Sequence, residues 1–502
     1  MPEPLDHPEP ELIDARDPER SRAPLERLGE RTWREALDWL YGPAAERPTA
    51  PDLYPDMRRS FFGDAGPGPA PTVGSPIDDV LAEFRERLAP HAYAAQHPGS
   101  YSYFTPPPLP VAIAGETLAR WLNQGIDVWL AGMAAPFVEE EVIAWLRDLV
   151  GYGEGSWGVL TSGGVMANLM AVAVARDVHL AKLLGTDEPP RGARLDGVRA
   201  YASDQTHFSI ERGLDLGGFP RGTLRVLSSD ADFRLRADVV ADAIVRDRAA
   251  GLRSFAIFGV AGSTNTGAID DVPALADLAE REGLWLHVDA AYGAAARISP
   301  REAHKVPDLE RADSLTVDPH KWMFQPYDIG GLLVRWREAL LRTFHREPEY
   351  YAVWGPEERP LHWYQYSLEG TRPFRALKLW LSWKHLGSAG FGTLIERTVD
   401  LAASLTAMAR ERGFEVVGPQ LAVVCLRLAP PGLDEERTDE LQRRLQRALE
   451  VSGDGWLSTT VLRGRTWLRA GVINYLSTEA DAERILDRLV AAAAGILPEL
   501  EG

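Results

Sequence analysis

The sequence predicts an α/β protein, in which a large domain with a mainly parallel sheet is followed by a smaller C-terminal α+β domain. Short apolar runs alternate with helical stretches such as 272–282 up to about residue 384, which is typical of a parallel sheet. Beyond this point the chain contains long helical stretches such as 393–412, and strand-like alternation at 455–461 and 466–472. We therefore expect an N-terminal segment over 1–110, a large domain over 111–385 and a small domain over 386–502.

Composition narrows the class of protein. A chain of 502 residues with 45% hydrophobic content is long enough to bury a large core. The formal net charge of −19 argues against nucleic acid or an anionic membrane as a partner. We recognise no targeting peptide, no apolar run of transmembrane length and no zinc-ligand spacing. The single cysteine, Cys425, excludes an intramolecular disulfide and indicates a reducing, cytoplasmic setting.

The most informative motif is Asp-Pro-His-Lys-Trp at 318–322, directly after the apolar run 314–317. The chain has only five lysines, and arginine carries nearly all of its positive charge. We therefore expect Lys321, at a strand end, to have a role other than keeping the protein soluble. Arginine cannot replace lysine where an amine must lose its proton and attack a carbonyl, which favours a Schiff-base role. The alternative is a lysine whose stem lies along apolar surface with its ammonium group in water.

A second apolar run, 284–289, ends in Asp289. Ligands of α/β sheets bind beyond the carboxyl ends of the strands, so Asp289 and Lys321 are expected to face one crevice. Pyridoxal phosphate needs this pair: a lysine to hold its aldehyde, and a carboxylate to keep its ring nitrogen protonated. Taken alone, Asp289 would more simply cap a turn or a helix.

Two segments, His-Val-Asp-Ala-Ala-Tyr-Gly at 287–293 and Pro-His-Lys-Trp at 319–322, carry a family resemblance. The chain resembles the group II pyridoxal-phosphate-dependent amino acid decarboxylases, which include the aromatic amino acid and glutamate decarboxylases, over about residues 85–495. The resemblance implies the type I pyridoxal-phosphate-dependent transferase fold. It also implies a homodimer that N-terminal helices embrace, with active sites near the subunit interface.

Three further segments match cofactor-binding parts of this family. Gly163 and Gly164 lie between a strand-like run and an apolar helix, where backbone N–H groups would cradle a phosphate. His207 matches the histidine that stacks on the pyridine ring, and Thr264 matches a threonine near the cofactor. A plain glycine turn and an ordinary loop are the competing interpretations. The expected cofactor-binding set is Lys321, Asp289, His207, Gly163, Gly164, Thr264, Ala291, His320 and Asp318.

The implied reaction is decarboxylation of an L-amino acid to the amine through a Schiff base at Lys321. In the family, a tyrosine on a loop after the lysine governs the final proton transfer. Counting back from Gly370 without gaps places His362 there, while Tyr350, Tyr351, Tyr364 and Tyr366 remain alternatives. The expected catalytic set is Lys321, His207, Asp289, His362, Tyr364 and Tyr366. The resemblance implies that a residue other than tyrosine at this loop position can favour oxidative deamination to an aldehyde over simple decarboxylation.

The substrate is expected to be aromatic. The segment 96–106 resembles the family segment that lines the side-chain pocket, which assigns Tyr103, Phe104 and Thr105 to substrate binding. An ordinary apolar contact with the N-terminal helices is the alternative. We find no arrangement of basic residues for an acidic substrate, although decarboxylation of an acidic amino acid stays a possible outcome.

Three classes of function remain open at this stage. The first is an amino acid decarboxylase, and the second is a lysine-linked enzyme with another outcome, such as aldehyde synthesis, transamination or carbon–carbon lysis. The third is a cofactor-binding or scaffold protein without activity. Lys321, Asp289 and His207 are all present, which argues against the third class.

Overall fold

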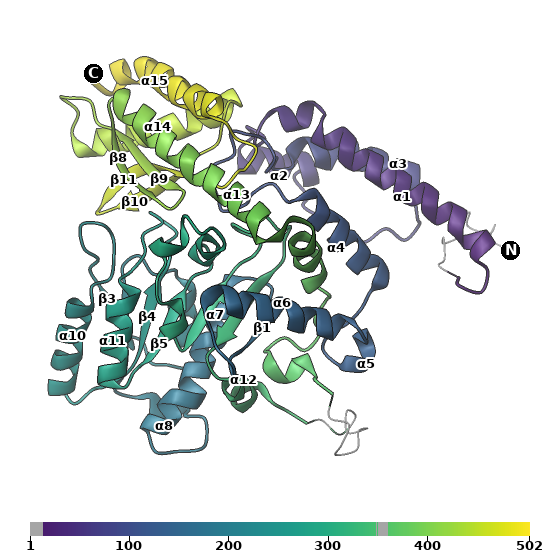
Figure 1. Cartoon of the computed structure of the whole chain (residues 1–502). Helices are drawn as coiled ribbons and strands as arrows, with labels where there is room; N and C mark the ends of the chain where they lie inside the picture. Colours follow the sequence, from purple (N-terminus) through teal and green to yellow (C-terminus); the bar gives the residue numbers. More distant parts are fainter. Residues whose placement is uncertain (1–13, 348, 350–359, 502) are drawn as a thin grey trace.

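The computed structural model describes residues 14–347, 349 and 360–501 (Figure 1). The helices are α1 Pro18–Leu40, α2 Tyr54–Phe62, α3 Ile77–Glu83, α4 Pro110–Leu122, α5 Trp129–Gly132, α6 Ala135–Val150, α7 Gly164–Val174, α8 Ala181–Leu183, α9 Ser209–Leu216, α10 Ala237–Ala249, α11 Val272–Glu282, α12 Arg337–Phe344, α13 Ala376–Glu411, α14 Glu435–Ser452 and α15 Glu479–Glu501. The strands are β1 Trp157–Thr161, β2 Val198–Ser203, β3 Leu224–Leu227, β4 Arg253–Val260, β5 Trp285–Asp289, β6 Ser314–Val317, β7 Gly330–Val334, β8 Phe414–Gln420, β9 Val423–Leu428, β10 Ser458–Leu462 and β11 Arg465–Gly471.

Within the described residues, the large domain is built on a seven-stranded sheet in the order β1-β7-β6-β5-β4-β2-β3. The strands from β6 to β3 pair in parallel, and β7 is antiparallel to both of its neighbours, β6 and β1. All strands of this sheet except β7 therefore run in the same direction. The carboxyl ends of β1, β2, β4, β5 and β6 lie along one edge as a result. The expected mainly parallel α/β sheet is confirmed.

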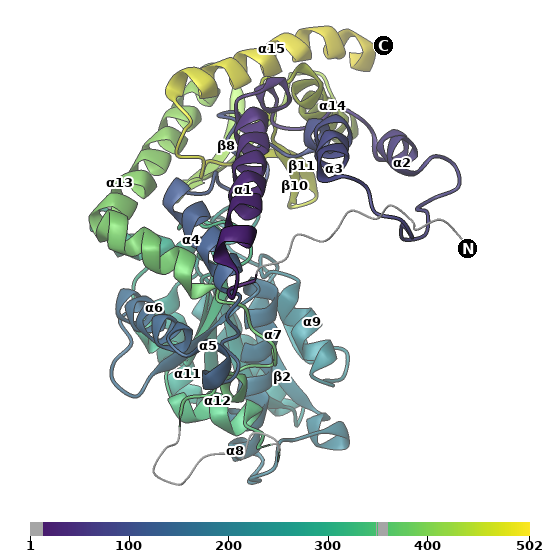
Figure 2. The ribbon, with the colours of Figure 1, turned by 90° about the vertical axis from the view of Figure 1, so that its right-hand side faces the viewer.

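Helices cover both faces of this sheet because its strands are apolar on both sides. The helices α6 and α11 lie on one side, and α7 and α9 lie on the other (Figures 1 and 2). The helical run Gly164–Leu183 is long and apolar enough to cross a membrane by length and composition alone, contrary to the expectation that no run reaches this length. It is 61% buried and packs across the sheet, as core helices do.

The C-terminal part contains a four-stranded antiparallel sheet among the described residues, in the order β10-β11-β9-β8. Helices α13 and α14 pack against it and α15 packs on both of them, so the expected α+β character is confirmed. The helix α13 crosses from the large sheet to the small one and is kinked at Gly387, where φ is 63° and ψ is 173°. The predicted domain boundary at 385/386 therefore falls within the range of α13, next to the break at Gly387 that divides it into two helical pieces.

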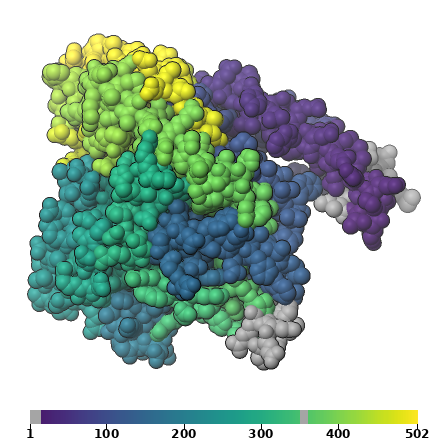
Figure 3. All heavy atoms as spheres, in the orientation of Figure 1, coloured from purple at the N-terminus to yellow at the C-terminus, as the bar shows by residue number. Residues whose placement is uncertain are grey.

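The N-terminal helix α1 projects from the body as an arm (Figures 1 and 3). None of its residues is buried, yet it carries large apolar side chains. Trp33 is 53% exposed and Leu37 is 37% exposed. An exposed apolar helix face of this kind is typical of a surface that another protein surface covers.

A buried ion pair anchors β1, the strand that leads to the glycine turn. The Glu139 carboxylate on α6 accepts a hydrogen bond from the Leu160 backbone N–H at 3.0 Å and another from Arg372 at 2.5 Å. Arg372 also donates to the Leu160 carbonyl at 2.5 Å, and neither charged side chain is exposed. Burial raises the pKa of Glu139, while the charge of Arg372 opposes that rise. The pair therefore ties α6, β1 and the segment that precedes α13 together.

We predict that Arg372→Met lowers the free energy of unfolding by about 3–5 kcal/mol, because it leaves the Glu139 carboxylate buried without its partner. Urea denaturation followed by circular dichroism measures this change. The double variant Glu139→Leu/Arg372→Met should recover part of the loss, since it removes both charges.

The matched control is Arg236→Met, which removes an arginine whose ion pair with Asp238 lies at the surface. We expect this control to leave the free energy of unfolding nearly unchanged, because solvent screens an exposed ion pair. Equal losses for the Arg372 and Arg236 variants would contradict the assignment of an anchoring role to the buried pair.

Candidate active site

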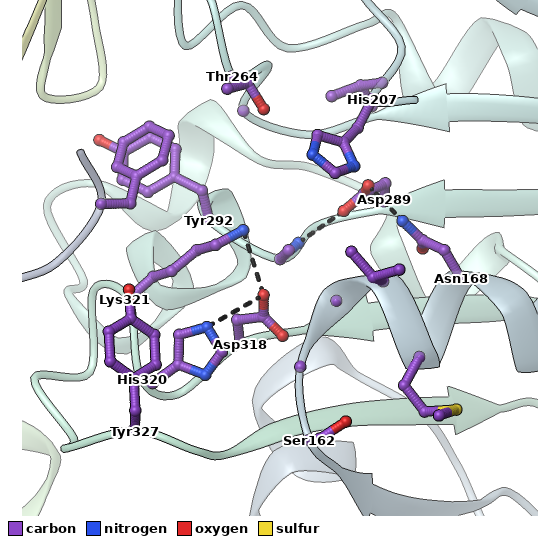
Figure 4. Close-up of a pocket in the computed structure, with 18 of the residues that line it drawn as sticks. Ser162, Asn168, His207, Thr264, Asp289, Tyr292, Asp318, His320, Lys321 and Tyr327 are labelled. Atoms are coloured by element: carbon purple, nitrogen blue, oxygen red, sulfur yellow. Dashed lines mark hydrogen bonds and ion pairs between the residues drawn. The ribbon is translucent and has the colours of Figure 1, made fainter. Parts of the chain in front are cut away.

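The carboxyl ends of five parallel strands surround a cavity of about 340 Å³ (Figure 4). Each strand or the loop after it contributes side chains: β1 is followed by Ser162 and Gly163, and β2 by His207. The strand β4 is followed by Thr264, β5 ends in Asp289, and β6 is followed by Asp318, His320 and Lys321. The cofactor-binding residues predicted from the sequence all line this cavity: Gly163, Gly164, His207, Thr264, Asp289, Ala291, Asp318, His320 and Lys321.

Lys321 lies in the turn after β6, and its side chain is 23% exposed. Its backbone N–H donates to the Asp318 carbonyl at 3.0 Å, and its Nζ lies 3.1 Å from Asp318 Oδ2. The same carboxylate oxygen lies 3.6 Å from His320 Nε2. Asp318 therefore holds the lysine amine at the mouth of the cavity, where a bound aldehyde would meet it.

Asp289 is the last residue of β5, and its carboxylate is held from two sides. Its Oδ1 accepts the backbone N–H of Ala291 at 3.1 Å, and its Oδ2 accepts Nδ2 of Asn168 at 2.7 Å. These bonds fix its direction into the cavity (Figure 4). A carboxylate fixed in this way is suited to pair with a protonated ring nitrogen.

His207 lies above Asp289 in Figure 4, and its ring forms part of the cavity wall. Its Nδ1 is 2.7 Å from Ser209 Oγ. Burial lowers the pKa of His207, which the nearby charge of Asp289 partly offsets. The imidazole is therefore neutral near pH 7 and offers a flat uncharged face to the cavity.

The glycine turn before α7 has the shape that a phosphate cradle requires. Gly163 has a φ of +151°, and a Cβ on this residue would lie 3.2 Å from the His320 ring. A Cβ on Gly164 would lie 2.8 Å from the Asp318 carboxylate. Only glycine fits both positions, and the first N–H groups of α7 have no acceptor within the helix. Together with Lys321 and Asp289, this cradle fits pyridoxal phosphate.

An aromatic wall lies beside Lys321. Phe104 stacks on Tyr292 with ring centroids 4.3 Å apart, and the Lys321 amine lies 5.9 Å from the Phe104 ring centroid. Thr105 does not line the cavity but hydrogen-bonds to the hydroxyl of the lining residue Tyr327 at 2.8 Å. Tyr103 is 58% exposed and contacts Trp456 instead. The structure thus brings one of the three predicted substrate residues, Phe104, into the cavity wall.

The predicted catalytic residues of the loop, His362, Tyr364 and Tyr366, do not line the cavity of their own chain. The short 3₁₀ helix Trp363–Tyr366 packs on Trp157, the first residue of β1, whereas the cavity lies beyond the last residue of that strand. A five-residue strand spans about 13 Å, so His362, Tyr364 and Tyr366 lie at the opposite end of β1 from Lys321. His362 Nδ1 accepts the Trp129 backbone N–H at 3.3 Å. Tyr350 and Tyr351 are outside the described residues.

Two residues missing from the predicted site set take part in the site. Asn168 lines the cavity and holds Asp289. Its position four residues after Gly164, in an apolar helix, is the sequence feature that could have indicated its role. The guanidinium of Arg469 on β11 is buried 4.6 Å from the Phe104 ring and donates to the Thr264 carbonyl at 2.6 Å. The sequence feature that could have indicated Arg469 is a charged residue within an apolar strand. Over the described residues, no group of three or more His, Cys, Asp or Glu side chains could hold a metal ion.

Comparisons with known proteins agree with this geometry. Residues 65–429 match the family described as the pyridoxal-dependent decarboxylase conserved domain. The chain is 34% identical to an aromatic-L-amino-acid decarboxylase of Bacillus atrophaeus, over 89% of this chain and 91% of that protein. It is 30% identical to a 4-hydroxyphenylacetaldehyde synthase of Rhodiola rosea, over 87% and 88% of the two chains.

A crystal structure of Oryza sativa TDC with PLP and tryptamine superposes with a TM-score of 0.86 at 27% identity, covering 96% of this chain and 99% of that one. The fold class predicted from the sequence is therefore confirmed, and so is pyridoxal phosphate as the cofactor. The chain belongs to the pyridoxal-dependent decarboxylase family and is a pyridoxal-phosphate-dependent amino acid decarboxylase.

Proposed function

We propose that the protein decarboxylates an aromatic L-amino acid to its amine. The aromatic wall carries this proposal, because Phe104 stacked on Tyr292 provides a flat apolar surface within 5.9 Å of the lysine amine. Aromatic rings pack well on such a surface. The similarity to a bacterial aromatic-L-amino-acid decarboxylase supports the same substrate class.

The chain's own residues have separate tasks in this reaction. Lys321 would hold the cofactor's aldehyde, Asp289 would hold the proton on its ring nitrogen, and the glycine cradle would hold its phosphate. When bound, pyridoxal phosphate supplies the electron sink for the pair left on Cα when carbon dioxide departs. Asp318 retains the Lys321 amine close to the cavity at 3.1 Å. Phe104 and Tyr292 limit the access of water beside that amine.

We propose further that the chain acts as a homodimer in the cytoplasm. The exposed apolar face of α1 supports a dimer, and so does the position of His362, Tyr364 and Tyr366 away from the cavity of their own chain. A second copy of the chain would cover the apolar face of α1. It would also offer a second cavity for these loop residues to reach. The single cysteine favours the cytoplasm, as the sequence already indicated.

Aldehyde synthesis is the second candidate function. Counting back from Gly370 without gaps places His362 at the position of the family's loop tyrosine, and two similar proteins are aldehyde synthases. This outcome consumes oxygen and water and releases hydrogen peroxide and ammonia along with carbon dioxide, so the products distinguish the two reactions.

Lys321→Ala should abolish the lysine-dependent absorbance of bound pyridoxal phosphate and lower turnover at least about a hundredfold, because no other lysine of the described residues lines the cavity. Spectra of the reconstituted protein with and without substrate measure both effects. The control is Lys182→Ala, which removes an exposed lysine of α8 and should leave the spectrum unchanged. Normal turnover in the Lys321 variant would overturn the assignment.

A panel of L-amino acids should give carbon dioxide and amine in equal amounts for tryptophan, tyrosine or phenylalanine, without hydrogen peroxide. Phe104→Ala should lower kcat/KM for the aromatic substrate by about tenfold or more, since a lost pocket contact costs about 1–3 kcal/mol. The same variant should affect a small aliphatic substrate less, which serves as the internal control. Peroxide and aldehyde as the main products would instead establish aldehyde synthesis.

Sedimentation of the purified protein should give twice the mass of one chain. Trp33→Asp together with Leu37→Asp should shift the protein toward monomers, because both changes place charge on the exposed apolar face of α1. The control is Val245→Asp, another exposed apolar residue, on α10 of the large domain. A wild-type monomer at micromolar concentration would refute the dimer.

A further inference from the structure

A buried chain of hydrogen bonds leads from the core of the sheet to the cavity. The Trp285 indole N–H donates to Ser314 Oγ at 3.0 Å, and Ser314 Oγ lies 2.9 Å from His287 Nδ1. His287 Nε2 in turn lies 3.0 Å from Asn168 Oδ1. These side chains are fully or almost fully buried, so water does not compete for their hydrogen bonds.

The chemistry of these groups fixes the direction of each bond. An indole nitrogen only donates, so Ser314 accepts from Trp285. An amide oxygen only accepts, so the proton of neutral His287 is on Nε2 and its Nδ1 is an acceptor. The Ser314 hydroxyl therefore donates to His287 Nδ1. Burial lowers the pKa of His287 to about 4, which agrees with a neutral ring that carries one proton.

The orientation of the Asn168 amide follows from its neighbours. Its Oδ1 also accepts the Thr316 hydroxyl at 2.6 Å. Its Nδ2 donates to Asp289 Oδ2 at 2.7 Å and to Ser209 Oγ at 2.8 Å. A flipped amide would place Oδ1 against the Asp289 carboxylate, where two acceptors would repel each other. Both protons of Nδ2 are therefore committed, one toward Asp289 and one toward Ser209.

The second of these protons goes to the group that faces His207. Ser209 Oγ accepts from Asn168 and lies 2.7 Å from His207 Nδ1. A backbone N–H only donates, and that of Ser209 points at Nδ1 at 3.4 Å, so Nδ1 is the accepting nitrogen of the ring. Ser209 then gives its hydroxyl proton to Nδ1, and the ring proton of neutral His207 is on Nε2.

We propose that Asn168 is a positioning residue that sets two groups of the site at once. Through Nδ2 it directs the Asp289 carboxylate into the cavity (Figure 4). Through Ser209 it holds His207 as the Nε2–H tautomer. His207 then offers a hydrogen-bond donor rather than an acceptor at Nε2. The proposal rests on the cofactor-facing roles of Asp289 and His207 assigned above.

The tautomer is tested in the protein before cofactor is added. Nitrogen-15 spectra of histidine-labelled apoprotein, with the His207 signals assigned through His207→Gln, distinguish a protonated from an unprotonated ring nitrogen. We expect an unprotonated Nδ1 and a protonated Nε2 in the wild type at pH 8. Ser209→Ala should give a mixture of tautomers, because it removes the hydroxyl proton from Nδ1. A wild-type His207 with its proton on Nδ1 would overturn the proposal, whatever the variants do.

Equilibrium dialysis of pyridoxal phosphate tests the link to Asp289. Asn168→Ala should weaken cofactor binding by about tenfold or more, since it removes a hydrogen bond to a charged group. Ser209→Ala leaves the bond between Asn168 and Asp289 intact and should bind within about threefold of wild type. Thr316→Val is the matched control, because it removes a bond to Oδ1 but neither donor of Nδ2. Wild-type affinity in Asn168→Ala would refute the role of Asn168.

Two further variants separate this proposal from the proposed function. Asn168→Ser retains one donor and should recover part of the affinity lost in Asn168→Ala, which a general packing defect would not allow. Lys321→Ala reports on the cofactor assignment itself. An unchanged spectrum in Lys321→Ala would sink the proposed function, whereas an unchanged tautomer in Ser209→Ala would refute the chain from Asn168 to His207.

Discussion

Parallel pairing in the large sheet is the constraint on which the site depends. Because β1, β2, β4, β5 and β6 run in one direction, residues distant in sequence end at the same edge. Asp289 is the last residue of β5, Lys321 follows β6 and His207 follows β2. No local feature of the chain would bring these three groups together, and the hydrogen-bond register of the sheet holds them in a common cavity.

The same sheet places polar side chains in its interior, where each must find a partner. Asn168, His287 and Ser314 satisfy one another in a chain that ends at Asp289. Leaving one buried donor or acceptor unpaired costs about 1–3 kcal/mol, so a chain of this kind has a single favourable arrangement. The core therefore orders the site as well as supporting it, because the direction of the Asp289 carboxylate depends on Asn168 and on the buried groups that orient its amide.

Much of the fold and of the site was predictable from the sequence. The strand ends carrying Lys321 and Asp289 were visible as apolar runs that stop at a charged residue, and the helix 272–282 has the bounds that its pattern indicated. The antiparallel direction of β7 was not predictable, because the run Gly330–Val334 has no periodicity to mark its direction. The two helical pieces of α13 meet at Gly387, whose φ of 63° and ψ of 173° are not helical, which agrees with the usual place of a glycine at a helix end.

The sequence by itself determined the chemical groups: a lysine where an amine is needed, a carboxylate for a ring nitrogen, and glycines where a Cβ would collide. Only the tertiary structure decided how Asn168 is oriented, that Arg469 from the small sheet reaches Phe104, and that His362 lies at the far end of β1. The reason is physical. Residue type fixes what a group can donate or accept, whereas distance and direction between groups depend on strand register and packing, which single-chain periodicity does not encode.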